Sequence, residues 1–190
     1  MAVLFQGGFR FIRVYLFFIL LTSCTSKISS INSDRDLNLN ENEGYLLLEV
    51  DTREDLKKIA IGGEKYIELT TRDLRSGSNY ILVSLPAGDY HIEKVQTKKK
   101  FRFRLEEEYW TFQVEKNVIS YIGTMSIKTS WFFANMELIN NSSLALEYLE
   151  ENFPNILSSR DIVYSGPGED RFFDLVRKKA LQERKEGSSL

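Results

Sequence analysis

The sequence is poor in the residues from which most catalytic and metal sites are built. Its 190 residues include one cysteine and one histidine. It can therefore form no intramolecular disulfide, and a zinc site made of several cysteines is excluded. The single histidine also excludes the usual histidine-rich catalytic and metal sites. Carboxylate-only sites for Ca²⁺ or Mg²⁺ stay open in principle, but we expect no metal ion and no cofactor.

A strong charge of one sign is also absent. The chain has 25 Lys and Arg against 27 Asp and Glu, a formal net charge of −2. A protein that binds nucleic acid or another polyanion usually has the opposite balance, so we expect no nucleic-acid partner. Hydrophobic residues at 43% and charged residues at 27% are typical of a globular protein. The length allows one domain of ordinary size with short appendages.

The N-terminal region contains an apolar run too short to span a bilayer. Val14–Leu21 has eight apolar residues, whereas a membrane-spanning helix needs about 20. Arg10 and Arg13 precede the run, and the small residues Thr22 and Ser23 follow it. This order of basic, apolar and small residues is typical of a signal peptide, which we place at residues 1–23.

The end of this region, Leu21-Thr22-Ser23-Cys24, resembles a bacterial lipobox. The resemblance implies cleavage between Ser23 and Cys24, a diacylglyceryl group on the Cys24 sulfur and usually an acylated amino terminus. Two or three acyl chains hold a protein stably at a membrane, whereas one holds it only marginally. The alternative is a transmembrane or core segment with an incidental thiol. The residue after the cysteine is Thr25 and not Asp. In lipoprotein sorting, this resemblance implies localisation to the outer membrane if the host is Gram-negative.

The segment after the cysteine predicts a lipidated, flexible tether over residues 24–43. Thr25–Glu43 is rich in Ser, Asn, Asp and Glu and has no sustained helical or strand period. Its 19 residues could extend roughly 60 Å, so we expect the folded domain to stand clear of the membrane.

Residues 44–140 predict an antiparallel sandwich of the immunoglobulin or transthyretin-like type. Short β-like runs alternate with turn signals, such as Gly62-Gly63 and the hairpin turn Pro86–Asp89. In the run 100–104, two Phe alternate with basic residues, which is the period of a strand. The expected strands are Tyr45–Val50, Lys57–Ile61, Lys65–Leu69, Asn79–Leu85, Asp89–Gln96, Lys100–Leu105, Tyr109–Val114, Val118–Ile127 and Trp131–Leu138.

Residues 141–190 predict a helical C-terminal extension. Ser142–Asn152 and Glu169–Lys185 have apolar residues at helical spacing. The extension either folds back on the sandwich or docks a partner. The first alternative is favoured, because an isolated helix of about 16 residues is marginal in water. The residues that would dock a partner are Phe172, Phe173, Leu175 and Val176.

Two motifs resemble bacterial transthyretin-like and PEGA-like β-sandwich modules. Ser84–Tyr90 is similar to their Leu-Pro-x-Gly-x-Tyr hairpin, and Val114–Gly123 is similar to their strand–turn–strand ending. Lys116-Asn117 stands where Pro-Gly is commonest in these modules. The resemblance implies a sandwich in a small envelope lipoprotein and a non-enzymatic role. It transfers no catalytic residue, and we expect none.

A basic run and two tryptophans are the candidate ligand-binding residues. Lys100, Arg102 and Arg104 could meet phosphate or an anionic glycan. The favoured alternative is a solvated hairpin whose bases pair with Glu106–Glu108 and block edge-to-edge association. Trp110 and Trp131 could stack on sugar rings, although aromatic residues in strands more often belong to the core. Trp131 is the better candidate for an exposed ring.

Two acid–base arrangements are weaker hypotheses. His91 could exchange protons with Glu93, but a lone surface histidine is the favoured interpretation. Glu106–Glu108 could form a glycosidase-like pair with Glu169 or Asp170, but acids clustered in a turn are usually solvated.

The sequence thus predicts a lipid-anchored, non-enzymatic envelope protein that acts as an interaction or structural module. Its partners would be the membrane, through Cys24, and an envelope protein or glycan. The alternatives are a carbohydrate- or cell-wall-binding module and an uncharacterised hydrolase. We also expect that deletion of Arg160–Leu190 leaves a stable sandwich.

Overall fold

The structure is a computed structural model that describes residues 26–36, 39–98, 101–105, 110–130 and 132–187. The predicted signal peptide, its cleavage site at Ser23 and the lipidation site at Cys24 therefore lie outside the described residues. No described helix is both long enough and apolar enough to cross a membrane.

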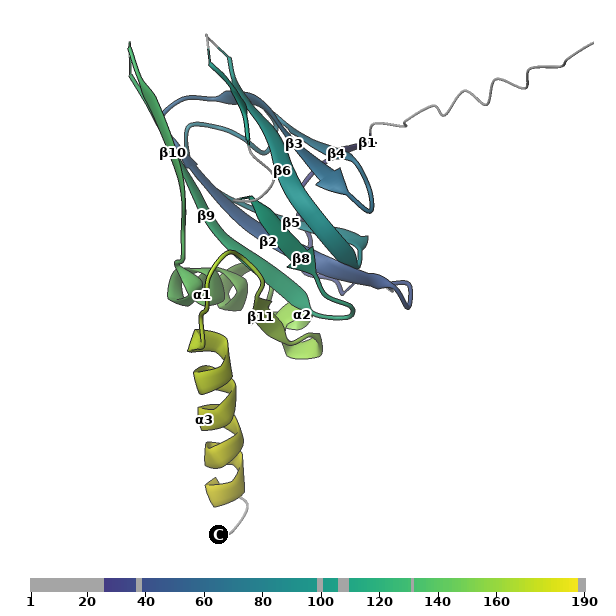
Figure 1. Cartoon of the computed structure of the whole chain (residues 1–190). Helices are drawn as coiled ribbons and strands as arrows, with labels where there is room; N and C mark the ends of the chain where they lie inside the picture. Colours follow the sequence, from purple (N-terminus) through teal and green to yellow (C-terminus); the bar gives the residue numbers. More distant parts are fainter. Residues whose placement is uncertain (1–25, 37–38, 99–100, 106–109, 131, 188–190) are drawn as a thin grey trace, which may run out of the picture.

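Two β-sheets pack face to face, and helices pack on the outer face of one of them at one end of the sheet (Figure 1). The fold is mainly β, with 48% strand and 20% helix, which confirms the predicted class. Sheet A has the strand order β1-β4-β3-β6-β7, and β8 also pairs with β6. Its strands are β1 (Ser26–Ile28), β3 (Leu56–Gly63), β4 (Ile67–Thr70), β6 (Gly88–Thr97), β7 (Arg102–Arg104) and β8 (Thr111–Val114).

Sheet B has the order β10-β9-β2-β5, and β11 also pairs with β9. Its strands are β2 (Glu43–Thr52), β5 (Gly77–Pro86), β9 (Ile119–Thr129), β10 (Ala134–Ile139) and β11 (Ile162–Tyr164). The helices are α1 (Ser142–Asn152), α2 (Pro154–Ser159) and α3 (Phe172–Gly187).

Both sheets are mixed, so the predicted antiparallel arrangement is wrong for three strand pairs. β1 pairs with β4, β2 with β9 and β11 with β9, all in parallel. The first two pairs are possible because the chain repeatedly passes from one sheet to the other, and strands distant in sequence become neighbours. β2 and β9 are buried over nearly their whole length. Near-continuous apolar runs are typical of central strands that are covered on both faces.

Alternation along β2 supplies two hydrophobic cores. Leu46, Leu48 and Val50 face sheet A, whereas Tyr45 and Leu47 face the helices. The first core lies between the sheets, and the second lies between sheet B and the helical layer. The second core consists of Tyr45, Leu47, Leu82, Ile119, Tyr121, Ala145, Leu149, Phe153, Ile156, Ile162 and Phe173.

The turn after β5 connects the two sheets and does not close a hairpin. β5 belongs to sheet B and β6 to sheet A, so the predicted return strand pairs elsewhere. Gly88 has a φ of +147°, a value that favours glycine, and the Tyr90 hydroxyl donates a hydrogen bond to the Pro86 carbonyl (2.9 Å). Gly62 and Gly63 also differ from the expected turn, because both lie within the end of β3.

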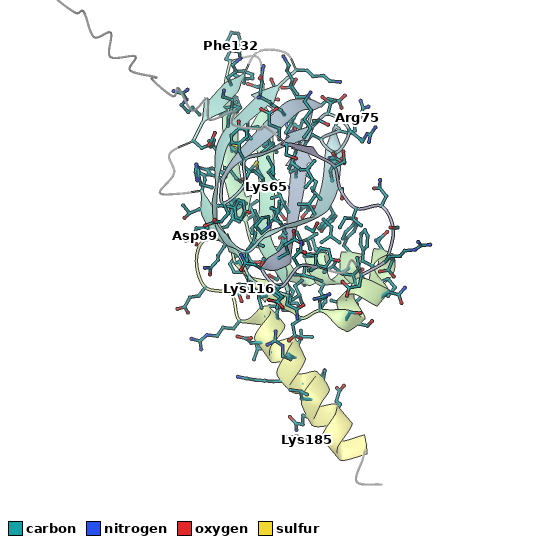
Figure 2. All side chains as sticks on the ribbon, turned by 90° about the vertical axis from the view of Figure 1, so that its right-hand side faces the viewer. Lys65, Arg75, Asp89, Lys116, Phe132 and Lys185 are labelled. Carbon is teal, nitrogen blue, oxygen red and sulfur yellow. The ribbon has the colours of Figure 1, made fainter. Side chains whose placement is uncertain are left out.

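The C-terminal segment folds back on the sandwich, as the favoured alternative expected. α1 has the predicted bounds, and β11 extends sheet B by hydrogen bonding beside β9. Phe173 is buried in the second core and is therefore not free to dock a partner. The rest of α3 projects away from the sheets, and residues 178–183 are exposed (Figures 1 and 2).

Residues 26–36 are held on the domain, which differs from the expected free tether. β1 adds to sheet A, and the Ile31 amide donates to the Leu82 carbonyl (2.8 Å). The carboxylate of Asp34 accepts the backbone N–H groups of Asn155 (2.8 Å) and Ile156 (3.0 Å) at the start of α2. Polar residues that composition alone assigns to a tether here cap a helix and form ion pairs.

Candidate functional site

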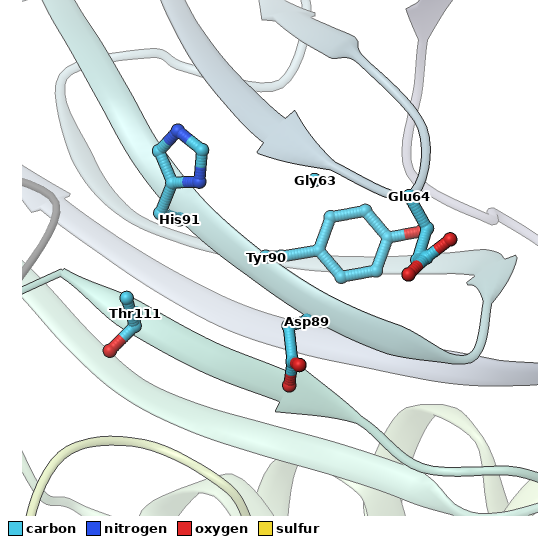
Figure 3. Close-up of a pocket in the computed structure, with 6 residues that line it drawn as sticks. All are labelled: Gly63, Glu64, Asp89, Tyr90, His91 and Thr111. Atoms are coloured by element: carbon cyan, nitrogen blue, oxygen red, sulfur yellow. The ribbon is translucent and has the colours of Figure 1, made fainter.

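A groove follows the outer face of β6. Two depressions, of about 390 and 310 Å³, adjoin at His91. Figure 3 shows the first, in which His91 and Tyr90 project from β6 and Glu64 lies beside the Tyr90 ring. The first is lined by Gly63, Glu64, Asp89, Tyr90, His91 and Thr111, and the second by His91, Glu93, Lys94, Arg104 and Leu105.

Glycine forms the floor in the middle of this groove. A Cβ atom on Gly62 would lie 2.4 Å from Glu93 Oε1 and 2.9 Å from His91 Nε2. Both side chains therefore cover Gly62, and their Nε2 and Oε1 atoms are 3.5 Å apart. A register shift in the β3–β6 pairing places Ala60 opposite Lys94 and Ile61 opposite Ile92, which leaves Glu93 as the extra residue. Such bulges redirect side chains, and here Glu93 lies beside His91.

The groove is acidic at one end and basic at the other. Glu64 and Asp89 line the first depression, whereas Lys94 and Arg104 line the second. Burial raises the pKa of Tyr90 to about 12, and the negative charge of Glu64 adds to this effect. With a histidine and a carboxylate between its ends, the groove offers hydrogen bonds to a small polar group.

The predicted basic residues are only partly gathered here. Arg104 and Arg102 are exposed on β7, where they lie opposite Lys94 and Gln96. Lys100 lies outside the described residues, as do Glu106–Glu108, so the expected pairing of these groups stays a prediction.

The neighbouring Lys98 is neutralised by an acid from another loop. Its Nζ lies 2.7 Å from Asp55 Oδ2. This hydrogen bond, with help from the Ser76 amide and Arg75, lowers the pKa of Asp55 to about 2. Part of the basic run thus belongs to an ion-pair cluster at the end of the sandwich.

The two tryptophans are in different situations. Trp110 is half-buried, packs against the first core, and its carbonyl accepts the Ile92 N–H at 3.0 Å. Trp131 lies outside the described residues. Its neighbours Phe132 and Phe133 are 95% and 64% exposed at the tip of the β9–β10 hairpin.

The predicted C-terminal acids have structural partners. Asp170 accepts the backbone N–H of Phe172 (2.8 Å) at the start of α3 and a hydrogen bond from the Ser142 hydroxyl. Burial would raise the pKa of Asp170, but the hydrogen bonds from Ser142 and Asn140 outweigh it and lower the pKa. Glu169 is exposed and lies 3.7 Å from Arg171. Asp170 therefore serves as a helix cap.

A buried carboxylate that the sequence analysis missed lies between sheet B and α1. Glu49 is 7% exposed and accepts hydrogen bonds from the hydroxyls of Ser78 and Thr124. Thr124 in turn contacts the Tyr121 hydroxyl (3.2 Å) and the Asn141 amide (3.0 Å). The one available signal was a charged residue inside the apolar run of β2. The network is satisfied by its own neighbours, so it supports packing.

A second polar depression lies between residues 30–32, β5 and α1. Its volume is about 320 Å³, and the Tyr80 ring stacks on that of Tyr148 with centroids 4.1 Å apart. Asp73 Oδ1 accepts the Ser30 N–H (3.1 Å), whereas the buried Oδ2 has no hydrogen-bond partner within the described part of the chain. The lining residues are Ser30, Ile31, Asn32, Asp73, Asn79, Tyr80, Tyr148, Asn152 and Phe153.

Among the described residues, neither the groove along β6 nor the depression beside Asp73 contains a recognisable metal centre. Among the residues that the structure describes, no group of three or more His, Cys, Asp or Glu side chains could hold a metal ion. Comparisons with protein-family models, with curated proteins and with solved structures found no match for this chain.

Proposed function

We propose that this chain is a lipid-anchored, non-enzymatic protein of the bacterial cell envelope, in the outer membrane if the host is Gram-negative. One observation carries the proposal: the lipobox-like Leu21–Cys24 follows a short apolar run and contains the only cysteine. An exported protein with a lipidated N-terminus would act by its position. It would present the sandwich and the helical layer to an envelope partner.

The start of β1 changes where such a domain would sit. Ser26 begins β1, and two residues of extended chain reach only about 7 Å, so a lipid carried by Cys24 would be separated from the start of β1 by no more than that length of chain. The lipid would therefore hold the domain against the bilayer and not tens of ångströms away. We further propose that the sandwich is a transthyretin-like variant. The turn at Pro86–Gly88, braced by the Tyr90 hydroxyl, supports this assignment.

The anchor is tested by replacing Cys24. We expect the native protein to incorporate labelled palmitate and to enter the detergent phase, and Cys24→Ala to abolish both. Thr25→Ala is the matched control, because it changes the next residue and keeps the thiol. Normal cleavage and full membrane attachment of the Cys24→Ala protein would contradict the proposal.

Glycan binding is a second candidate function, and the depression beside Asp73 favours it. The depression contains stacked tyrosines, three asparagines whose side-chain oxygens can accept hydrogen bonds, and a carboxylate oxygen with no partner among the described residues. Aromatic rings and such oxygens are groups that bind sugars. Titration with N-acetylglucosamine oligomers, followed by NMR of the asparagine side-chain amides, tests this candidate. Shifts that vanish in Asp73→Ala would support it, and unchanged spectra of the native protein would refute it.

A further inference from the structure

The tip of the β9–β10 hairpin presents aromatic rings to solvent on a well-formed turn. The Ser130 amide donates to the Phe133 carbonyl (2.8 Å). The Ser130 hydroxyl oxygen accepts the N–H groups of Phe132 (3.4 Å) and Phe133 (3.3 Å). The backbone is thus satisfied while the rings of Phe132 and Phe133 are 95% and 64% exposed.

These rings are not the margin of a core. Farther along β10, Met136 and Leu138 pack against the first core, so the strand already supplies its buried residues. Phe132 and Phe133 precede β10, beyond the part that pairs with β9. Exposed apolar clusters of this kind mark contact sites.

The tip and the anchored edge lie away from α3. Phe132 is at one end of the molecule and Lys185 of α3 is near the other (Figure 2). β1 lies in the half of the molecule away from α3 (Figure 1). If Cys24 carries lipid, as proposed above, the bilayer lies within about 7 Å of chain from Ser26. The inference below rests on that anchor for its location.

We propose that Phe132 and Phe133 insert into the interfacial region of the bilayer that holds the lipid anchor. This second, non-covalent contact would fix the orientation of the domain, with α3 pointing away from the membrane. Aromatic residues are the side chains that prefer the boundary between headgroups and acyl chains.

Lipid is a better occupant than a protein surface because of the size of the tip. A stable protein interface buries about 800 Å² on each partner, which the two exposed rings of a hairpin end do not offer. The first charged residues along the two strands of the hairpin neutralise each other, because Lys128 pairs with Glu137 (3.2 Å). In the sequence, Thr129, Ser130 and Trp131 separate Lys128 from Phe132, and none of them is charged.

The test uses the mature chain with Cys24→Ala, so that no acyl chain contributes. Vesicles of phosphatidylethanolamine and phosphatidylglycerol are sedimented with this protein, and the bound fraction gives a partition coefficient. We expect Phe132→Ser with Phe133→Ser to lower the coefficient at least tenfold. Leu181→Ser, which removes a half-exposed leucine from α3, should leave it unchanged. Thermal melting of each variant verifies that the fold is retained.

A fluorescence measurement gives an independent result. With Trp110→Phe in the same background, Trp131 is the only tryptophan, and its emission should shift to the blue on adding vesicles. Absence of binding by the parent protein, or equal binding by the double variant, would overturn the proposal. Because the protein carries no lipid, that failure would leave the palmitate result at Cys24 untouched.

Discussion

The sharpest stability prediction concerns the two halves of α3. Phe173 is 4% exposed, and its ring meets that of Tyr121 edge-on, with centroids 6.2 Å apart. Truncating a buried phenylalanine to alanine typically costs about 3–5 kcal/mol. With a urea dependence of about 2 kcal/mol/M, Phe173→Ala should lower the unfolding midpoint by about 2 M. The assay is urea unfolding followed by tyrosine fluorescence and far-UV circular dichroism.

Leu181, in the same helix, is the matched control. It is 50% exposed, and α3 projects from the sheets at this point. Leu181→Ala should change the free energy of unfolding by no more than about 0.5 kcal/mol. Equal midpoint shifts for the two variants, or a shift near zero for Phe173→Ala, would refute the assignment of α3 to the second core.

The same reasoning reverses an expectation from the sequence. Deletion of Arg160–Leu190 was expected to leave a stable sandwich, but it removes Phe173, Ile162 and the β11 strand. Burying each of these side chains contributes about 1.5–3 kcal/mol, against a total stability of about 5–15 kcal/mol for a domain. We now expect the deletion to unfold the protein or to leave it barely stable.

Two further predictions concern an ion pair and a pair of glycines. Burial would raise the pKa of Asp36, but hydrogen bonds from Arg160 and Tyr45 outweigh this effect and lower the pKa. The carboxylate therefore stabilises the folded state fully above its unfolded pKa near 3.8, and this stabilisation is lost as the pH falls through the lower folded pKa. Asp36→Asn should therefore cost about 1 kcal/mol at pH 7 and flatten the acid limb of a plot of stability against pH, and an unchanged limb would contradict this. Gly63→Ala should lower the melting temperature much more than Gly62→Ala. A Cβ on Gly63 would lie 2.3 Å from the Asp89 carbonyl oxygen, and the φ of +138° is strained for alanine. A Cβ on Gly62 would instead meet the side chains of Glu93 and His91, which can move. Equal melting temperatures for the two glycine variants would show that the β3–β6 contact differs from the one described.

Local patterns predicted the elements well and their partners poorly. Ser142–Asn152 was predicted with its observed bounds because a helical apolar period and a following proline act within a few residues, although the expected serine cap is not formed and Asn141 is the N-cap residue. The parallel pairing of β2 with β9 could not be predicted in this way. Its register places Tyr45 opposite Ile119, and no local pattern encodes a partner so distant. β11 was missed because three residues are too short to show a period.

The N-terminal segment shows a different limit of predicting structure from amino-acid composition. Asp34 and Asp36 increase its polarity and so favour a tether, yet both acids bind groups in the C-terminal part of the chain. Prediction of the candidate site from the sequence was limited in the same way. His91 and Glu93 were considered together because they are two residues apart on a strand, but the glycine floor beneath them comes from β3. The depression beside Asp73 combines three segments and left no signal in the sequence.

The hydrogen bonds of Asp34 and Asp36 have a consequence for the order in which the protein folds. They join residues that are 121 to 124 positions apart, and they connect the first described strand region to α2 and the residue after it. During synthesis the N-terminus leaves the ribosome first, so these contacts cannot form until most of the chain has left the ribosome. Folds dominated by such distant pairings form slowly, because a long loop must close before any contact rewards it. The attachment of the N-terminal segment to sheet A and α2 would therefore be among the last steps of folding. If the chain is exported and lipidated as proposed, this segment would stay accessible to the processing enzymes until then.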